Sequence, residues 1–235
     1  MFTQKVKPRG RGRPPGPTAE GAAAKRRLYE TAIGLMARKG YESTTLRDVA
    51  KEAGVSVGLL YRYFPSKRAV IIALYDELSA DYASRAAAMP RGKWRERFVF
   101  ALTTSLEVLA PHRTALKGLI PVLVGDPDEG VFSATMAFSR ERVQGVFEHA
   151  VSEATDSPGA PLAAALGRLL YLVHLAVLLW WLLDRSAHQR ATSALVGLAR
   201  QILPSAALTL RLSPVRRLLL SGDALFREAM LGEAH

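Results

Sequence analysis

The segment 57–63 reads V-G-L-L-Y-R-Y, an unusual composition for a helix whose outer face meets only solvent. Tyrosine hydroxyls and an arginine guanidinium are suited to hydrogen bonds with DNA phosphates and base edges, and a glycine lets another backbone come close. The outward positions predicted for this helix are Val57, Gly58, Tyr61, Arg62 and Tyr63. The chemistry indicated is DNA recognition; the alternative is a small helical hairpin with an aromatic packing face.

Capping and turn residues around this segment predict a helix-turn-helix. Thr45 can cap a first helix, and Asp48 completes a capping box in which Asp stands for the usual Glu or Gln. Gly54 follows that helix, where a left-handed backbone costs glycine little. Ser56 can cap the second helix, and Pro65 stops it. Apolar residues at helical spacing line the inner faces, namely Leu46, Val49, Ala50, Ala53, Leu60 and Phe64.

The run from about Ala24 to Leu78 resembles the N-terminal domain of TetR-family transcriptional regulators. The resemblance covers about a quarter of the chain. One departure is Arg68, where the family often has an acidic residue. The matching residues are Gly40-Tyr41, Thr44-Thr45, Val49-Ala50, Ala53-Gly54-Val55-Ser56, Gly58, Leu60-Tyr61, Tyr63-Phe64 and Ser66-Lys67.

The resemblance implies DNA contacts residue by residue. It implies that Val57 and Gly58 face base edges, and that Tyr61 and Arg62 reach base edges or phosphates. Phosphate contacts are implied for Thr45, Tyr63 and Lys67, and the expected DNA-binding set also includes Ser56.

The N-terminal residues 1–18 are rich in Pro, Gly and Arg, and we expect a disordered basic arm. Residues 1–27 hold eight basic residues and one acidic residue, a net charge of +7 against +11 for the whole chain. A basic tail on a nearly balanced body favours a polyanionic partner such as DNA. Arg11-Gly12-Arg13-Pro14 matches the core of an AT-hook. Insertion of Arg11 and Arg13 into a minor groove and a nonspecific cationic tether both remain open.

Catalytic and metal-binding patterns are missing from the sequence. The 235 residues include no cysteine, which excludes disulfides, thiol nucleophiles and thiolate metal sites. The five histidines form no pair at metal-binding spacing, and no G-x-S-x-G, P-loop or Rossmann glycine pattern occurs. We therefore expect no enzyme, no metal and no cofactor.

Helical periodicity is expected along the whole chain after residue 18, so an all-α fold is predicted. The expected order is a helix-turn-helix domain over 19–66, a connecting helix over 67–88, and a C-terminal domain over 89–235. The resemblance implies that this last domain binds an effector and dimerises. Its expected helices are 94–109, 113–124, 131–153, 162–183, 188–203 and 214–231, with a stop at Pro204.

The segment 162–183 is apolar on every side. Residues 169–183 hold no charged side chain, about five residues short of the length needed to cross a bilayer. A helix that is apolar all round must be buried all round, by its own core and by a second subunit. The resemblance implies a homodimer through 162–183 and 188–203, and we place Leu178 and Leu182 on the exposed stripe.

By resemblance, the protein is a repressor that a small apolar effector releases from a double-stranded DNA operator. Candidate pocket residues are Phe132, Met136, Phe138, Phe147, Tyr171, His174 and Trp181, each with ordinary core packing as the alternative. A second hypothesis is a nucleoid-type architectural protein without an effector. The residues Met1–Lys5 lack the apolar core of a signal peptide, so a cytoplasmic location and no membrane association are expected.

Overall fold

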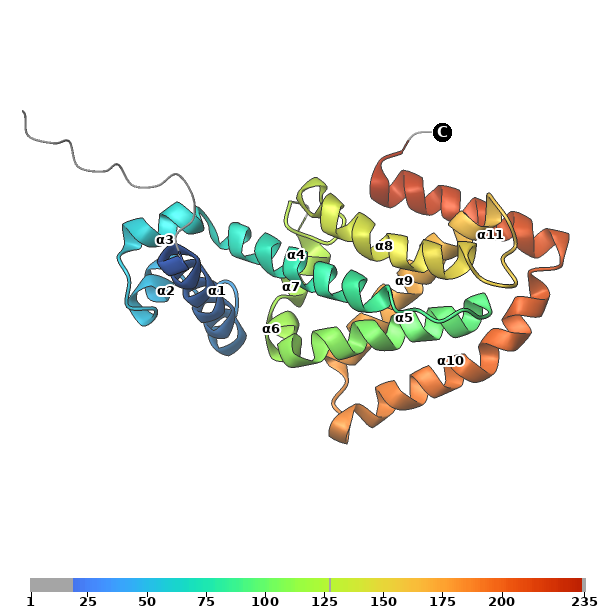
Figure 1. The fold of residues 1–235 in the computed structure, drawn as a ribbon, viewed down its shortest axis with the longest axis horizontal. Coiled ribbons are helices and arrows are strands. Elements are labelled where there is room, and N and C mark those ends of the chain that lie inside the picture. Colours follow the sequence, from blue (N-terminus) through green and yellow to red (C-terminus); the bar gives the residue numbers. More distant parts are fainter. Residues whose placement is uncertain (1–18, 127, 234–235) are drawn as a thin grey trace, which may run out of the picture.

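The computed structural model describes residues 19–126 and 128–233, which form a small helical head joined to a larger helical body (Figure 1). The head contains α1 (Ala19–Lys39), α2 (Leu46–Glu52) and α3 (Val57–Tyr63). Helix α4 (Lys67–Ala86) starts at the head and runs into the body. The described ranges contain no β-strand, and the predicted all-α class is confirmed. The arm, with Arg11 and Arg13, lies outside these ranges.

The body is built around one helix pair. Helix α9 packs along α8, α4 and α5 pack on the other faces of α8, and α11 packs on α9. Helix α10 contacts chiefly α5 and stands at the edge of the body (Figure 1). The body helices are α5 (Trp94–Leu109), α6 (Arg113–Gly118), α7 (Ile120–Gly125), α8 (Ala137–Ser152), α9 (Leu162–Leu183), α10 (Arg190–Thr209) and α11 (Ser213–Phe226), which a π-helical turn (Arg227–Leu231) follows.

Three predicted helices differ from the structure. The helix expected over 113–124 is two short helices, because Pro121 in the first turn of α7 has no N–H to continue the earlier hydrogen-bond ladder. The helix expected from 131 begins at Ala137, since Ser133 is extended, with ψ at 156°. Pro204 does not stop a helix: α10 continues to Thr209, at the cost of one backbone hydrogen bond.

Close packing of α8 on α9 depends on Gly167. A Cβ atom at this position would lie 2.5 Å from Cα of Glu148 on α8, too close for any side chain. Because the two helices come this close, large side chains from both helices can pack together in one aromatic core. That core contains Tyr82, Phe98, Phe147, Tyr171 and His174, all of them buried.

Helix α9 is long and apolar enough for a membrane span by length and composition alone. In the fold it lies between α8 and α11, and many of its side chains face them. Arg168 in its second turn pairs with Asp223 of α11 at 2.6 Å. These contacts explain the apolar composition as that of a central bundle helix.

The exposed side of α9 differs from the predicted stripe. Leu182 is buried at 8% exposure, so its predicted exposure is wrong, and Leu178 is half-buried. The exposed apolar side chains follow a spacing of three, four and seven residues: Val173, Ala176, Leu179, Trp180 and Leu183. We call this set the α9 stripe. One register step separates the two sets, and residues 175–183 hold no charged side chain that would have fixed the register.

Candidate nucleic-acid interface and ligand sites

The helix-turn-helix has the local geometry that the sequence predicts. Thr45 Oγ1 accepts the backbone N–H of Asp48 at 3.1 Å, and the Asp48 carboxylate accepts the N–H of Thr45 at 3.2 Å. The Thr45 hydroxyl also donates to the Asp48 carboxylate at 2.7 Å, and this bond, together with the one from the Thr45 N–H, lowers the pKa of Asp48. Gly54 takes φ +66°, and Ser56 Oγ accepts the N–H of Leu59 at 3.2 Å. Both helices are therefore capped, and the turn between them is fixed.

Helix α3 separates an inner and an outer face. Leu60 and the following Phe64 are buried in the head. Tyr61 is 48% exposed and Val57 39%. Nothing lies within 4 Å of a Cβ built on Gly58, and Arg62 is exposed with no hydrogen bond or ion pair to another described residue. The outer face is thus free for an outside partner, while the inner face holds the helix in place.

The remaining predicted contacts are more constrained. The hydroxyls of Thr45 and Ser56 serve as helix caps, and Tyr63 is half-buried. The Lys67 ammonium donates to the carbonyl oxygen of Tyr41 at 2.8 Å and lies 4.3 Å from the centre of its ring. A phosphate contact by Lys67 stays a prediction.

Two exposed cations were absent from the predicted set. Arg47 and Lys51 are exposed on α2, and the side chain of neither makes a hydrogen bond or ion pair with another described residue. The signal that could have found them is their spacing, four residues apart on one face of a helix adjoining the recognition helix.

Residues 28–74 match the family described as bacterial regulatory proteins, tetR family. Residues 28–74 therefore form a TetR-type DNA-binding domain. The TetR-type segment is 47% identical over 47 residues to the uncharacterized HTH-type transcriptional regulator YuxN of Bacillus subtilis, covering 20% of this chain and 16% of that protein. It is 46% identical over 43 residues to the HTH-type transcriptional repressor KstR of Rhodococcus jostii, covering 18% and 20%. The chain therefore matches at most a fifth of the length of these relatives.

Solved TetR-family structures extend the similarity to the body, as fold alone. A tetR-family transcriptional regulator from Streptomyces coelicolor has a TM-score of 0.61 at 20% identity, over 86% of this chain and 89% of that one. FadR from Bacillus subtilis, in complex with stearoyl-CoA, has a TM-score of 0.60 at 16% identity, over 76% and 96%.

The predicted pocket residues do not share one cavity. Tyr171, His174 and Phe147 belong to the aromatic core, and Met136 is also buried. Phe132 and Trp181 line two different grooves. Phe138 is 68% exposed, with the Arg142 guanidinium 4.5 Å from its ring centre. Phe138 therefore faces solvent, and its expected place in an interior pocket is corrected.

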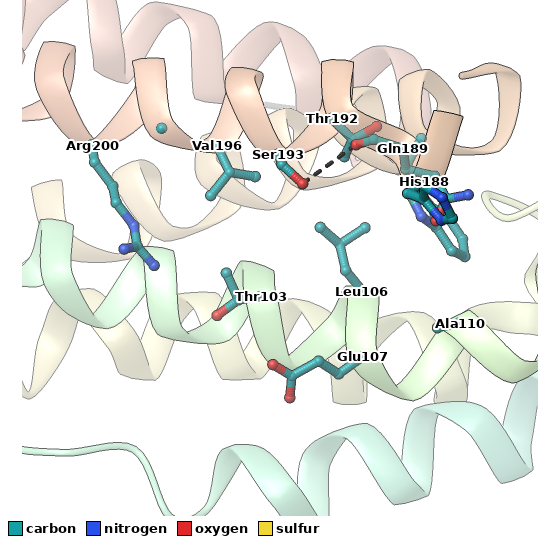
Figure 2. Close-up of a pocket in the computed structure, with 12 residues that line it drawn as sticks. Thr103, Leu106, Glu107, Ala110, His188, Gln189, Thr192, Ser193, Val196 and Arg200 are labelled. Carbon is teal, nitrogen blue, oxygen red and sulfur yellow. Dashed lines mark hydrogen bonds between the residues drawn. The ribbon is translucent and has the colours of Figure 1, made fainter. Parts of the chain in front are cut away.

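A groove separates α10 from α5 (Figure 2). One cavity of about 450 Å³ adjoins another of about 630 Å³, and Thr103 and Arg200 line both. In Figure 2, Arg200 reaches from α10 toward α5. We call this space the α5–α10 groove. Its apolar walls are Val99, Phe100, Leu106, Trp181, Val196 and Leu203.

Basic residues gather at one end of the α5–α10 groove. A third cavity of about 560 Å³ shares Arg95 and Pro204 with the second and adds three cations. The nearby Asp156 carboxylate already accepts hydrogen bonds from the N–H of Trp94 and from Arg95. The added cations are Lys93, Arg211 and Arg216. This end of the groove therefore carries net positive charge.

His174 is the polar centre of the aromatic core. Its ring stacks on Tyr82, with centroids 6.2 Å apart, and lies 4.7 Å from Phe147. Nε2 is 2.8 Å from Ser105 Oγ, whereas Nδ1 has no partner among the described residues. Burial lowers the pKa of His174 to about 3. The ring is therefore neutral at physiological pH.

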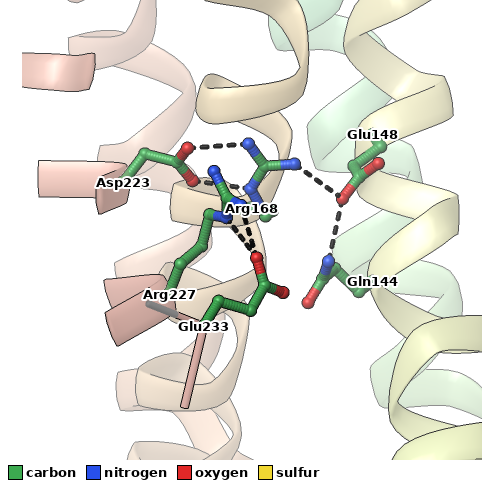
Figure 3. A network of polar contacts seen from close by, with 6 residues as sticks. All are labelled: Gln144, Glu148, Arg168, Asp223, Arg227 and Glu233. Atoms are coloured by element: carbon green, nitrogen blue, oxygen red, sulfur yellow. Dashed lines mark hydrogen bonds and ion pairs between the residues drawn. The ribbon is translucent and has the colours of Figure 1, made fainter. Parts of the chain in front are cut away.

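A polar network fixes α11 to the pair α8–α9 (Figure 3). The Arg168 guanidinium donates two parallel hydrogen bonds to Asp223, at 2.6 and 2.7 Å, and lies 3.6 Å from Glu148. Gln144 donates to Glu148 at 2.8 Å. The Asp223 side chain is 7% exposed, so this bidentate pair is shielded from solvent. The network therefore fixes the N-terminal part of α9 to α8 and α11.

The described residues contain no group of three or more His, Asp or Glu side chains that could hold a metal ion. Several charged groups of the body serve structural contacts instead. Arg97, for example, is buried and donates to the carbonyl oxygens of Pro90, His149 and Ala150, which closes the end of α8.

Proposed function

We propose that this chain is a cytoplasmic transcriptional repressor that binds operator DNA as a homodimer and leaves it when a small molecule binds the body. The observation that carries the proposal is α3, whose inner face is buried while its outer face presents Tyr61, Arg62 and an open Gly58. This chain is similar over the head alone to the HTH-type transcriptional repressor KstR, and that similarity supports the same function. The proposed function requires no catalytic residue.

Truncation of the α3 outer face should weaken specific DNA binding. We expect Tyr61→Ala and Arg62→Ala each to cost about 1–3 kcal/mol, because each removes contacts to base edges or phosphates. Duplexes selected from a random library by the parent protein provide the operator, and fluorescence anisotropy at fixed salt gives the affinity. Arg85→Ala is the matched control, since Arg85 is exposed on α4 and pairs only with Asp81.

The selected DNA also separates the two hypotheses. A repressor dimer selects a discrete inverted repeat, whereas an architectural protein coats A·T-rich DNA without a fixed site length. Unchanged affinity in both α3 variants, or a selected pool without an inverted repeat, contradicts the proposal.

We place the dimer interface on α9 and α10. The α9 stripe is an uninterrupted apolar surface, and α10 carries exposed Leu198 and Ile202 four residues apart. Those two side chains lie on a different side of α10 from Val196 and Arg200, which line the α5–α10 groove. The groove therefore stays open when the stripe is covered.

We place the effector in the α5–α10 groove and infer an anionic amphiphile. The lining cations outnumber the lining carboxylates Glu96, Glu107 and Asp156. An apolar wall next to this excess of positive charge suits a ligand with an acyl chain and an anionic head. The stearoyl-CoA of the similarly folded FadR supports this class.

Charge reversal at Arg200 should test the effector site. We expect Arg200→Glu to weaken binding of stearoyl-CoA roughly tenfold or more, because a charged hydrogen bond becomes a repulsion. Isothermal titration with stearoyl-CoA measures it, and Arg85→Glu is the control. Equal affinity in both variants, or no binding to the parent, removes the groove as the site of this ligand class.

A further inference from the structure

The head is tied to the body by hydrogen bonds at the loop between α7 and α8. The Tyr41 hydroxyl donates to Glu129 Oε2 at 2.6 Å. The Arg68 guanidinium donates to the carbonyl oxygen of Asp128 at 2.6 Å and to Thr135 Oγ1 at 2.9 Å. We call these five residues the latch. Tyr41 and Arg68 come from the head and the start of α4, and the other three come from the body.

The body side of the latch is held in place by its own loop. Asp126 Oδ1 accepts the N–H groups of Asp128 and Glu129, both at 2.8 Å. The Asp126 carbonyl oxygen accepts the N–H of Gly130 at 2.8 Å, and a Cβ on Gly130 would lie 2.4 Å from that oxygen. The tight turn therefore requires glycine, and it fixes the acceptors that face the head.

The head side of the latch is equally ordered. Tyr41 is 9% exposed, and Lys67 both bonds to its carbonyl oxygen and covers its ring. The Thr44 hydroxyl donates to the carbonyl oxygen of Gly40, which closes the same turn. Because contacts within its own part of the molecule hold each side in place, we expect little side-chain entropy to oppose the hydrogen bonds between them, unlike those of a mobile surface pair.

The far side of the same loop lies on the helices of the body. Val131 and Phe132 line an apolar groove of about 260 Å³ with Leu175 and Leu178 of α9. The Phe132 ring is 6.0 Å from that of Phe226 on α11, in an edge-to-face arrangement. One short loop thus contacts the head on one side and the α9–α11 pair on the other.

A second contact runs beside the latch. Helix α1 packs against α6, where a Cβ on Gly118 would lie 3.3 Å from the Met36 carbonyl oxygen. Arg113, at the start of α6, donates to the carbonyl oxygens of Trp181 and Asp184 at the end of α9. The segment from α6 to the latch is therefore anchored to α9 at both of its ends.

We propose that the latch sets the orientation of the DNA-binding head, and that Arg68 and Tyr41 are positioning residues through which movement of α9 reaches α3. This regulation rests on the proposed function, because it assumes that α3 binds DNA and that the body binds an effector. It gives a role to Arg68, the residue at which the helix-turn-helix motif departs from the TetR pattern. The bonds join two separately packed parts, so breaking them should loosen the head, which α1 and α4 still connect to the body, without unfolding it.

Distances between spin labels can test the latch without DNA or effector. The chain has no cysteine, so Lys51→Cys in the head and Glu141→Cys in the body give two unique, exposed labelling positions. The labelled chain is diluted with unlabelled chain, so that only distances within one protomer are recorded. We expect a single narrow distance distribution in the parent, and a broader or shifted one in Tyr41→Phe and Arg68→Ala.

The controls separate the latch from general loosening. Arg85→Ala, on the same helix as Arg68, should leave the distribution as in the parent. Melting curves identify any variant that is not folded, and Tyr41→Phe keeps the buried ring that Lys67 covers. Unchanged distributions in both latch variants overturn the proposal.

A double-mutant cycle on the selected operator tests the consequence for DNA binding. Tyr41→Phe and Glu129→Ala should each lower operator affinity roughly five- to thirtyfold, within the usual range for coupling between sites. The double variant should lose no more operator affinity than the single variant that binds the operator less tightly, because both substitutions remove the same hydrogen bond. Additive losses contradict the latch. Failure to select any operator would contradict the proposed function, while the label distances would still decide on the latch.

Discussion

Replacing Leu179 with glutamate should convert the proposed dimer into a monomer and lower operator affinity by more than about a hundredfold. Leu179 lies at the centre of the α9 stripe and is 36% exposed in the single chain. A carboxylate there would be buried without a partner in the dimer, at a cost of about 3–5 kcal/mol. A monomer also binds one half-site only and loses the gain from two linked heads, about 10²–10⁴ in affinity.

Light scattering measures the first effect and anisotropy the second. The parent should have about twice the chain mass of 25.6 kDa, and Leu179→Glu should have the chain mass itself. Leu218→Glu is the matched control, because Leu218 is 73% exposed on α11, away from the α9 stripe. If Leu179→Glu stays dimeric, the interface does not lie on the α9 stripe. If Leu218→Glu is monomeric, the interface lies on α11.

The head could be predicted almost residue by residue because its signals are local. The capping box at Thr45, the positive φ of Gly54 and the cap at Ser56 each depend on neighbours within four residues. Helix caps and turns can be recognised from residues a few positions apart, so their prediction needs no knowledge of the rest of the fold. The same holds for the bounds of α5 and α9, which match their predicted ranges.

The body could not be predicted at that resolution, because its signals are not local. Phe147 is fully buried and Phe138 is 68% exposed, although both lie on α8 among similar residues. Which of them faces inward depends on where α4, α5 and α9 pack, and no short spacing records that. Pro204 shows the same limit: proline usually ends a helix, but α10 tolerates it as an exposed residue in a long helix.

The latch and the grooves were missed for a related reason. Tyr41 and Glu129 are 88 residues apart in the chain and meet through one hydrogen bond. The sequence did single out Arg68, but as a departure from a pattern and not as a contact. One of its acceptors is a backbone carbonyl oxygen, which every residue carries, and the other is the hydroxyl of Thr135, far away in the chain, so neither partner could be recognised in the sequence.

The free energy of unfolding should fall steeply as the pH drops from about 6.5 toward 4, and His174 should be a major cause. Its pKa is about 3 in the folded protein, because burial disfavours the charged ring, against 6.5 in an unfolded chain. In this window the unfolded state binds a proton that the folded state does not. Stability is therefore fully present above pH 6.5 and is lost as the pH falls, by at most about 1.4 kcal/mol per pH unit.

His174→Gln isolates this contribution. Glutamine can keep a hydrogen bond to Ser105 but binds no proton, so the variant should lose stability more slowly with falling pH than the parent. Urea unfolding at several values between pH 7 and 4 gives the two slopes, and carboxylates that titrate in both proteins cancel in the difference. Because only slopes are compared, a constant loss from imperfect packing of glutamine between Tyr82 and Phe147 does not affect the result. Equal slopes would mean that the ring can take up a proton inside the fold, and the aromatic core would then have to admit water or open at His174.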